Sequence, residues 1–142
     1  MVTGKKFIVA YDGSADSKKA LALATDLAKA CMAKILLVSV SSNAPTAVAE
    51  GMDYGWVTID SEKFYTGKAE AGKKYCEEKG IEVHTEVLQG SPAEEIIKYA
   101  KQENADMIIA GTRGLGGFAR LLLGSVAHQL VAYSDIPVLI VK

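Results

Sequence analysis

The chain has 142 residues, with 16 Lys and Arg against 17 Asp and Glu, and it is 49% hydrophobic and 23% charged. This length fits one domain, and the composition excludes a disordered chain. The net charge of −1 argues against a nucleic-acid partner, which requires a basic excess. No apolar run approaches the ~20 residues of a membrane span or forms a secretory signal, so we expect a cytoplasmic protein without a membrane partner.

The first part of the chain predicts two buried strands separated by a helix. Lys6 to Tyr11 is a short apolar run that ends at the turn residues Asp12-Gly13-Ser14. Apolar residues then recur at helical spacing from Ala20 to Cys31, with Asp16 or Ser14 available as a cap. Ile35 to Val40 is continuously apolar, as in a parallel sheet covered on both faces.

The middle of the chain begins with a long segment without periodicity, Ser41 to Asp60. Such segments usually cover a site, bind a partner or move, and the sequence leaves its role open. Ser61 to Lys79 resumes a helical pattern, and Gly80 is typical of a left-handed cap. Ile81 to Leu88 alternates in part, which predicts a strand near the edge of the sheet.

The last part of the chain opens with a strong helix-start signal. Ser91 stands at the N-cap, Pro92 at the first helical position and Glu94 where a capping box needs it, and the helix extends to about Glu103. A strand follows at Met107–Ala110, and a glycine-rich turn at Gly111–Gly117. A further helix extends to about Tyr133, and Pro137–Val141 is a closing strand. This alternation predicts an α/β fold: a single-domain open parallel five-stranded sheet with helices on both faces.

The cysteines and histidines suggest no metal chemistry. Cys31 and Cys76 lie in helical patterns without CxxC spacing, which favours reduced thiols, the first in the core and the second partly exposed. His84 and His128 have no ligand spacing between them, so we expect no metal site.

Two loops follow strands and could hold a ligand, because ligands in such sheets lie beyond the carboxyl ends of strands where the strand order reverses. Asp12-Gly13-Ser14 is one loop, and Gly111-Thr-Arg-Gly114 begins the other; the two are neighbours if the strand order is 3-2-1-4-5. Nine residues after Gly114, Gly124-Ser125 precedes a helical stretch. Glycines allow close backbone approach, and amides at a helix N-terminus attract anions, so this pattern predicts a phosphate cradle without a P-loop lysine.

Alternatives remain for two of these residues. Asp12 either binds a ligand or simply caps the turn after the strand, and Arg113 either binds phosphate or lies in solvent.

The spacing Gly111-x2-Gly114-x9-Gly124-Ser125 resembles the ATP-binding signature of the universal stress protein family, and the resemblance covers residues 1–142 as one nucleotide-binding domain. Asp12-Gly13-Ser14, Ser91-Pro92 and the closing Ile136–Val141 also stand where that family has them. The resemblance implies strand order 3-2-1-4-5 and binding of ATP, or of AMP or ADP, with or without Mg²⁺. It also implies a homodimer that pairs through Pro137 to Val141.

The resemblance further implies roles for individual residues. Asp12 would bond the ribose hydroxyls, the backbone of Val40 would meet the adenine, and Ala10 and Tyr11 would line the base and sugar. Family members commonly have a small residue or proline where Tyr11 stands. The residues that would hold the phosphates are Ala110, Gly111, Gly114, Gly124, Ser125 and Val126, with Arg113 as a further candidate.

Two functions follow from this pattern. The first is an ATP-binding regulatory protein of the stress response with little or slow hydrolysis, since the motif places no histidine, lysine or second carboxylate to activate water, and we assign no catalytic residue. The alternative is an enzyme of the pyrophosphate-loop type that cleaves ATP to AMP and pyrophosphate, suggested by the run from Asp12 to Ser17. Asp12 and Ser14 both break that second pattern. A dinucleotide dehydrogenase is excluded because GxGxxG does not follow the first strand.

Overall fold

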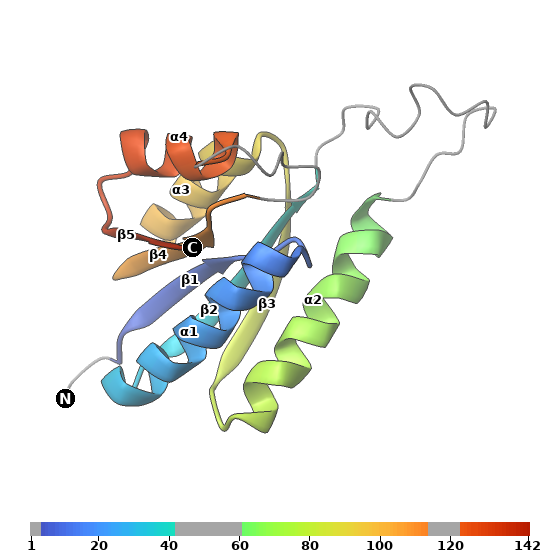
Figure 1. The fold of residues 1–142 in the computed structure, drawn as a ribbon, viewed down its shortest axis with the longest axis vertical. Coiled ribbons are helices and arrows are strands. Elements are labelled where there is room, and N and C mark those ends of the chain that lie inside the picture. The colour runs from blue at the N-terminus through green and yellow to red at the C-terminus, as the bar shows by residue number, and fades with distance from the viewer. Residues whose placement is uncertain (1–3, 42–60, 114–122) are drawn as a thin grey trace.

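The computed structural model describes residues 4–41, 61–113 and 123–142, with side chains from residue 64 onward in the second range. In these residues strands and helices alternate along the chain (Figure 1). All strand pairs are parallel, and the sheet has the order β3-β2-β1-β4-β5, which confirms the predicted fold. The elements are β1 (Lys6–Ala10), α1 (Ala15–Cys31), β2 (Lys34–Ser41), α2 (Ser61–Glu78), β3 (Val83–Gln89), α3 (Pro92–Gln102), β4 (Met107–Gly111), α4 (Ser125–Tyr133) and β5 (Val138–Val141).

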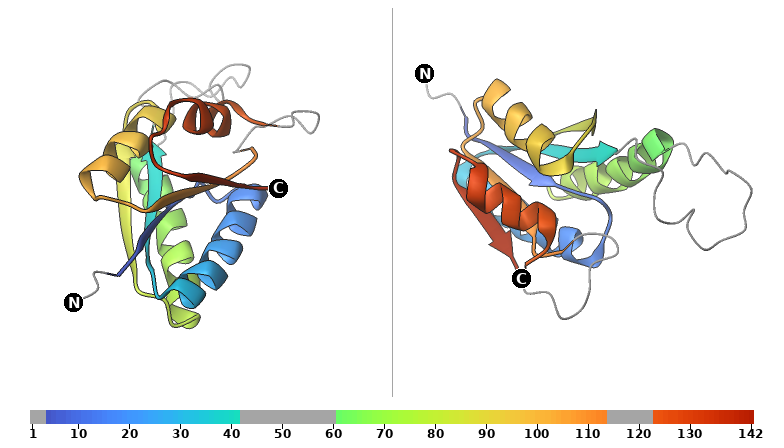
Figure 2. Two further views of the ribbon diagram at one scale, coloured as in Figure 1. Left: turned by 90° about the vertical axis from the view of Figure 1, so that its left-hand side faces the viewer. Right: turned by 90° about the horizontal axis from the view of Figure 1, so that it is seen from above.

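The helices form a layer on each face of the sheet, with α1 and α2 on one side and α3 and α4 on the other (Figure 2). Each face has its own hydrophobic cluster. Along β1 the side chains alternate between them: Phe7 and Val9 pack under α1 and α2, and Ile8 packs under α3 and α4. A strand that is buried on both faces is mainly apolar, which is why the central strands are rich in hydrophobic residues.

Helix α1 has clear start and stop signals. The Ser14 hydroxyl accepts a hydrogen bond from the Ser17 amide at 3.2 Å, so Ser14 is the N-cap. The helix ends where Met32 takes a left-handed conformation with φ of 55°. Small residues at helical spacing, Ala20, Ala24 and Ala28, are almost completely buried and let α1 lie close to the sheet.

The ends of the next helices agree only in part with prediction. Gly80 has φ of +76°, as a left-handed cap requires. Ser91 is the N-cap of α3 and Pro92 begins the helix, but the Ser91 side chain makes no capping hydrogen bond, so the predicted capping box is wrong. The side chain of Glu95, rather than that of Glu94, lies against the residues before the helix. Its Cγ would be 2.9 Å from a Cβ added at Gly90.

The two cysteines are placed opposite to expectation. Cys31, expected in the core, is exposed because it is the last residue of α1, beyond the stretch that packs on the sheet. Cys76, expected to be partly exposed, is completely buried. It lies one and two turns beyond Gly72 and Ala69, which are also buried, so these residues form the face of α2 that contacts the sheet.

The two edges of the sheet differ in character. Strand β3 lies at one edge, as predicted, and exposes His84 and Glu86. Strand β5 lies at the other edge, and its four apolar residues are all half-buried. Within the three described ranges, no helix combines the length and the apolar character that crossing a bilayer requires.

Candidate functional site at the carboxyl edge of β1 and β4

The strand order reverses between β1 and β4, because β1 leads to β2 on one side while β4 lies on the other. The residues that follow these two strands contact one another. Thr112 and Arg113, directly after β4, both bond Asp16 in the first turn of α1. The sequence therefore predicted correctly that the two loops are neighbours, and they meet where doubly wound sheets bind ligands.

The turn after β1 is held by its own side chains. Asp12 Oδ1 accepts a hydrogen bond from the Ser14 amide at 2.9 Å, and Gly13 has φ of +83°, which favours glycine. One carboxylate oxygen of Asp12 thus shapes the turn, as the capping interpretation requires. A carboxylate has several acceptor positions, so this bond is compatible with a ligand contact through the rest of the group.

Helix α2 brings side chains to this turn that the sequence did not point to. The stem of Lys68 lies over Gly13, where an added Cβ would be 2.7 Å from Lys68 Cδ. The Lys68 ammonium lies 5.5 Å from the centre of the Phe64 ring, within cation–π range. Burial and then the nearby charge of Asp12 raise the pKa of Tyr65. The first two turns of α2 therefore form a wall beside the Asp12 turn.

Tyr11 contributes backbone, rather than its ring, to the carboxyl edge. The ring is 6% exposed and belongs to the cluster under α1 and α2, where Gly72 makes room for it. Burial, followed by the charges of Asp12 and Cys76, raises the pKa of the Tyr11 phenol. The Tyr11 carbonyl accepts a hydrogen bond of 2.6 Å from the buried Ser39 hydroxyl. A large residue is tolerated at this position because its side chain lies beneath α2.

The glycines after β4 and before α4 allow close approach between chain segments. A Cβ on Gly111 would lie 2.8 Å from the backbone carbon and oxygen of Asp16. A Cβ on Gly124 would lie 3.0 Å from the Thr112 carbonyl oxygen and 3.3 Å from Arg113 Cα, and the Gly124 amide donates a hydrogen bond to that carbonyl. Both positions need glycine for packing at the site, in addition to any role toward a phosphate.

The Arg113 side chain turns toward α1 and pairs with Asp16. Its Nε donates to Asp16 Oδ2 at 3.2 Å, and the Thr112 hydroxyl donates to the same oxygen, also at 3.2 Å. The Arg113 side chain is 30% exposed and that of Asp16 13%, so this ion pair is largely shielded from water. Asp16 is a second carboxylate at the site, which sequence reasoning considered as a helix cap and as part of the run from Asp12 to Ser17.

Helix α4 starts beside this pair. Gly124 is its N-cap and provides no side chain to cap the first turn, so no side-chain hydrogen bond forms at this cap. Ser125, its first residue, is exposed and accepts a hydrogen bond from Gln129 at 3.1 Å through its hydroxyl. A helix beginning in this way directs backbone amides toward the space in front of it.

The other predicted residues lie along the same edge. Ala10, Val40 and Val126 are half-buried against the cluster under α3 and α4, and Ala110 is buried in it. Gly114 and residues 42–60 lie outside the described residues. The structure thus brings every described member of the predicted set to the carboxyl ends of β1, β2 and β4 or to the start of α4.

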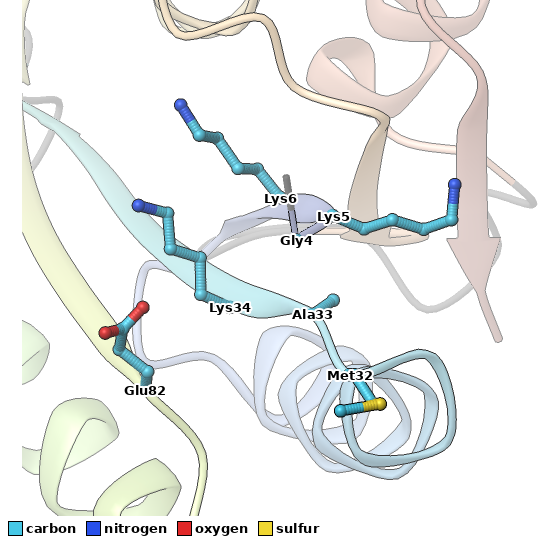
Figure 3. Close-up of a pocket in the computed structure, with 7 residues that line it drawn as sticks. All are labelled: Gly4, Lys5, Lys6, Met32, Ala33, Lys34 and Glu82. Carbon is cyan, nitrogen blue, oxygen red and sulfur yellow. The ribbon is translucent and has the colours of Figure 1, made fainter. Parts of the chain in front are cut away.

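A cavity of about 320 Å³ lies at the opposite end of the sheet, where β1 and β2 begin (Figure 3). Lys5, Lys6 and Lys34 line it, and Figure 3 shows the Lys5 side chain extending to the side opposite to those of Lys6 and Lys34. The Lys6 ammonium also donates to the Glu103 carbonyl at 3.0 Å. The three lysines therefore do not converge on one anion position. Within the described ranges, no group of three or more His, Cys, Asp or Glu residues could hold a metal ion.

The strand order defines a doubly wound α/β domain, and the candidate site lies at the point where that order reverses. The family model described as "Universal stress protein family" matches residues 4–142, and the chain belongs to this family.

Individual proteins agree with this assignment. The universal stress protein MJ0531 of Methanocaldococcus jannaschii is 39% identical over 143 residues, covering 97% of this chain and 82% of that protein. The solved structure of the protein MJ0577 matches with a TM-score of 0.79 and 29% identity, over 99% of this chain and 97% of that one. A universal stress protein solved in complex with cAMP has a TM-score of 0.74 and 22% identity, over 97% of each chain.

Proposed function

We propose that this chain is an adenine-nucleotide-binding regulatory protein of the stress response. It binds ATP, ADP or AMP, with or without Mg²⁺, and hydrolyses ATP slowly or not at all. The observation that carries the proposal is the contact between the Asp12–Asp16 region and the segment after β4, at the switch point of the sheet. A universal stress protein of this fold has been solved with the adenine nucleotide cAMP, which supports the choice of ligand class.

In this proposal the ligand lies across the carboxyl ends of β1 and β4. Asp12 bonds the ribose hydroxyls, the Val40 backbone meets the adenine edge, and Ala10 with the Tyr11 backbone lines the base and sugar. The phosphates are held by Ala110, Gly111, Arg113, Gly114, Gly124, Ser125 and Val126. Residues 1–142 act as one nucleotide-binding domain located in the cytoplasm.

The open edge at β5 supports pairing of two chains. Its four apolar residues, Val138–Val141, are all half-buried, and among the strands of the described ranges β5 has a neighbour on one side only. Unpaired backbone groups at such an edge are a template for another strand. We therefore propose a homodimer that forms through β5.

Slow turnover is proposed because the carboxylate nearest the end of β4 is already engaged. Asp16 accepts two hydrogen bonds on one oxygen, from Thr112 and Arg113, so this oxygen holds the two loops together instead of orienting a water molecule.

The test is mass spectrometry of nucleotide released from freshly purified protein, followed by incubation with ATP. Recovery of adenine nucleotide, with mostly ATP and slight ADP after incubation, supports the proposal. No adenine nucleotide bound under any condition contradicts it, and rapid release of AMP and pyrophosphate identifies an enzyme of the pyrophosphate-loop type instead.

A further inference from the structure

The ion pair between Asp16 and Arg113 joins the two halves of the candidate site. Asp16 lies in the first turn of α1, 97 positions before Arg113, which follows β4. Their 3.2 Å contact is reinforced by the Thr112 hydroxyl on the same carboxylate oxygen. Asp16 therefore fixes the direction of the Arg113 side chain, and Thr112 in turn holds Asp16.

The backbone of Arg113 lies beside the start of α4, whereas its guanidinium is held toward α1. Arg113 Cα is close to Gly124, at 3.3 Å from the position of an added Cβ, and Gly124 begins α4. The side chain, however, turns toward α1 and its carboxylate. In this arrangement the charge of Arg113, whose backbone adjoins the start of α4, is paired with that of Asp16.

The charges around this part of the site balance one another. Among the residues that the structure describes at these two turns, the carboxylates Asp12 and Asp16 stand beside the cations Arg113 and Lys68. A phosphate tail that extends from the sugar toward α4 thus gains little net attraction from these side chains, and each added phosphate brings further negative charge. The affinity for the phosphate tail of the nucleotide then depends on whether Arg113 remains paired with Asp16.

We propose that Asp16 is a specificity-determining residue: by holding Arg113, it reduces the gain in affinity that each additional phosphate gives. The inference rests on the proposed function, since it concerns the same nucleotide site. Wild-type protein accordingly discriminates weakly between AMP and ATP measured without divalent cations. The affinity for the adenosine part of the ligand does not depend on Asp16.

The experiment is isothermal titration of adenosine, AMP, ADP and ATP without divalent cations, using full-length wild type, Asp16→Asn, Arg113→Gln and the double variant. Asn keeps an acceptor for Thr112 and Arg113 but removes the charge. We expect Asp16→Asn to bind ATP about fivefold more tightly, the upper range for a partly exposed ion pair, with a smaller gain for AMP and less than a twofold change for adenosine. In the Arg113→Gln background the same substitution should change ATP affinity by less than twofold, because Asp16 acts through Arg113.

Adenosine affinity is the internal control for folding, since a variant with a damaged site loses it together with ATP affinity. Unchanged or weaker ATP binding in Asp16→Asn refutes the inference, because the carboxylate then supports tail binding or does not influence it. A fivefold gain that persists without Arg113 also refutes it, since Asp16 would then act by direct repulsion. If wild type binds none of the four ligands, the proposed function itself fails, whereas wild-type binding with an unresponsive Asp16→Asn overturns this inference alone.

Discussion

Replacing Gly72 with alanine tests whether α2 packs closely against Leu37 and Tyr11 near the candidate site. A Cβ at this position would lie 2.7 Å from Leu37 Cδ2 and 3.3 Å from Tyr11 Cε2. Leu37 is completely buried and Tyr11 is 6% exposed, so neither side chain has open space to move into. Alanine favours the helix by ~1 kcal/mol over glycine, while overpacking a core costs about 1–3 kcal/mol. We expect the free energy of unfolding of Gly72→Ala to fall by up to about 2 kcal/mol.

Gly67→Ala, in the same helix, is the matched control, because an added Cβ there meets nothing within 4 Å. It should gain ~1 kcal/mol from helix propensity alone. Urea unfolding at equal m-values measures both variants, and their free energies should differ by about 1–3 kcal/mol. Equal stabilisation of the two variants would show that α2 does not contact Leu37 and Tyr11 as described.

Three further predictions concern the turn after β1 and the buried thiol. Asp12→Ala should weaken adenine-nucleotide binding by about 1.5–3 kcal/mol, or roughly 10- to 150-fold by calorimetry, and unchanged affinity would remove Asp12 from the site. Ser14→Ala should lower the unfolding free energy by ~1 kcal/mol through loss of the α1 cap to Ser17, which chemical denaturation would detect. Burial raises the pKa of the Cys76 thiol from 9.0 to about 11, so the native state keeps a proton that the unfolded chain releases. The unfolding free energy should therefore fall between pH 9 and 11, and the fall should be smaller in Cys76→Ala; parallel pH profiles would contradict the assignment.

The strands and their order were predictable because the sequence signals for them are local. Continuous apolar runs such as Ile35–Val40 belong to strands covered on both faces, and the alternation with helical segments restricts the fold to few arrangements. The motif from Gly111 to Ser125 then indicated the carboxyl edge of β4 as the candidate site. Features that depend on local sequence, such as the strands and the glycine motif, could be predicted, and so could the strand order that follows from the topology.

The contacts that the sequence did not predict depend on how whole elements are rotated and packed. Tyr65 and Lys68 reach the Asp12 turn because buried small residues on α2 set the face it turns to the sheet, and helical periodicity alone does not orient neighbouring helices. The pair of Asp16 and Arg113 joins positions 97 apart, so no local pattern indicates it. The capping box at Ser91 failed for a similar reason, since the Glu95 side chain occupies the space near Gly90.

The unequal edges of the sheet limit how far copies of this chain can add to one another. Charged and polar groups on β3 discourage a second strand from joining there, while short, apolar β5 remains receptive. A subunit with a receptive strand at each end would polymerise into open fibres. In the proposed dimer, pairing through β5 uses the same surface on both copies and leaves none of the described strands receptive to a third copy.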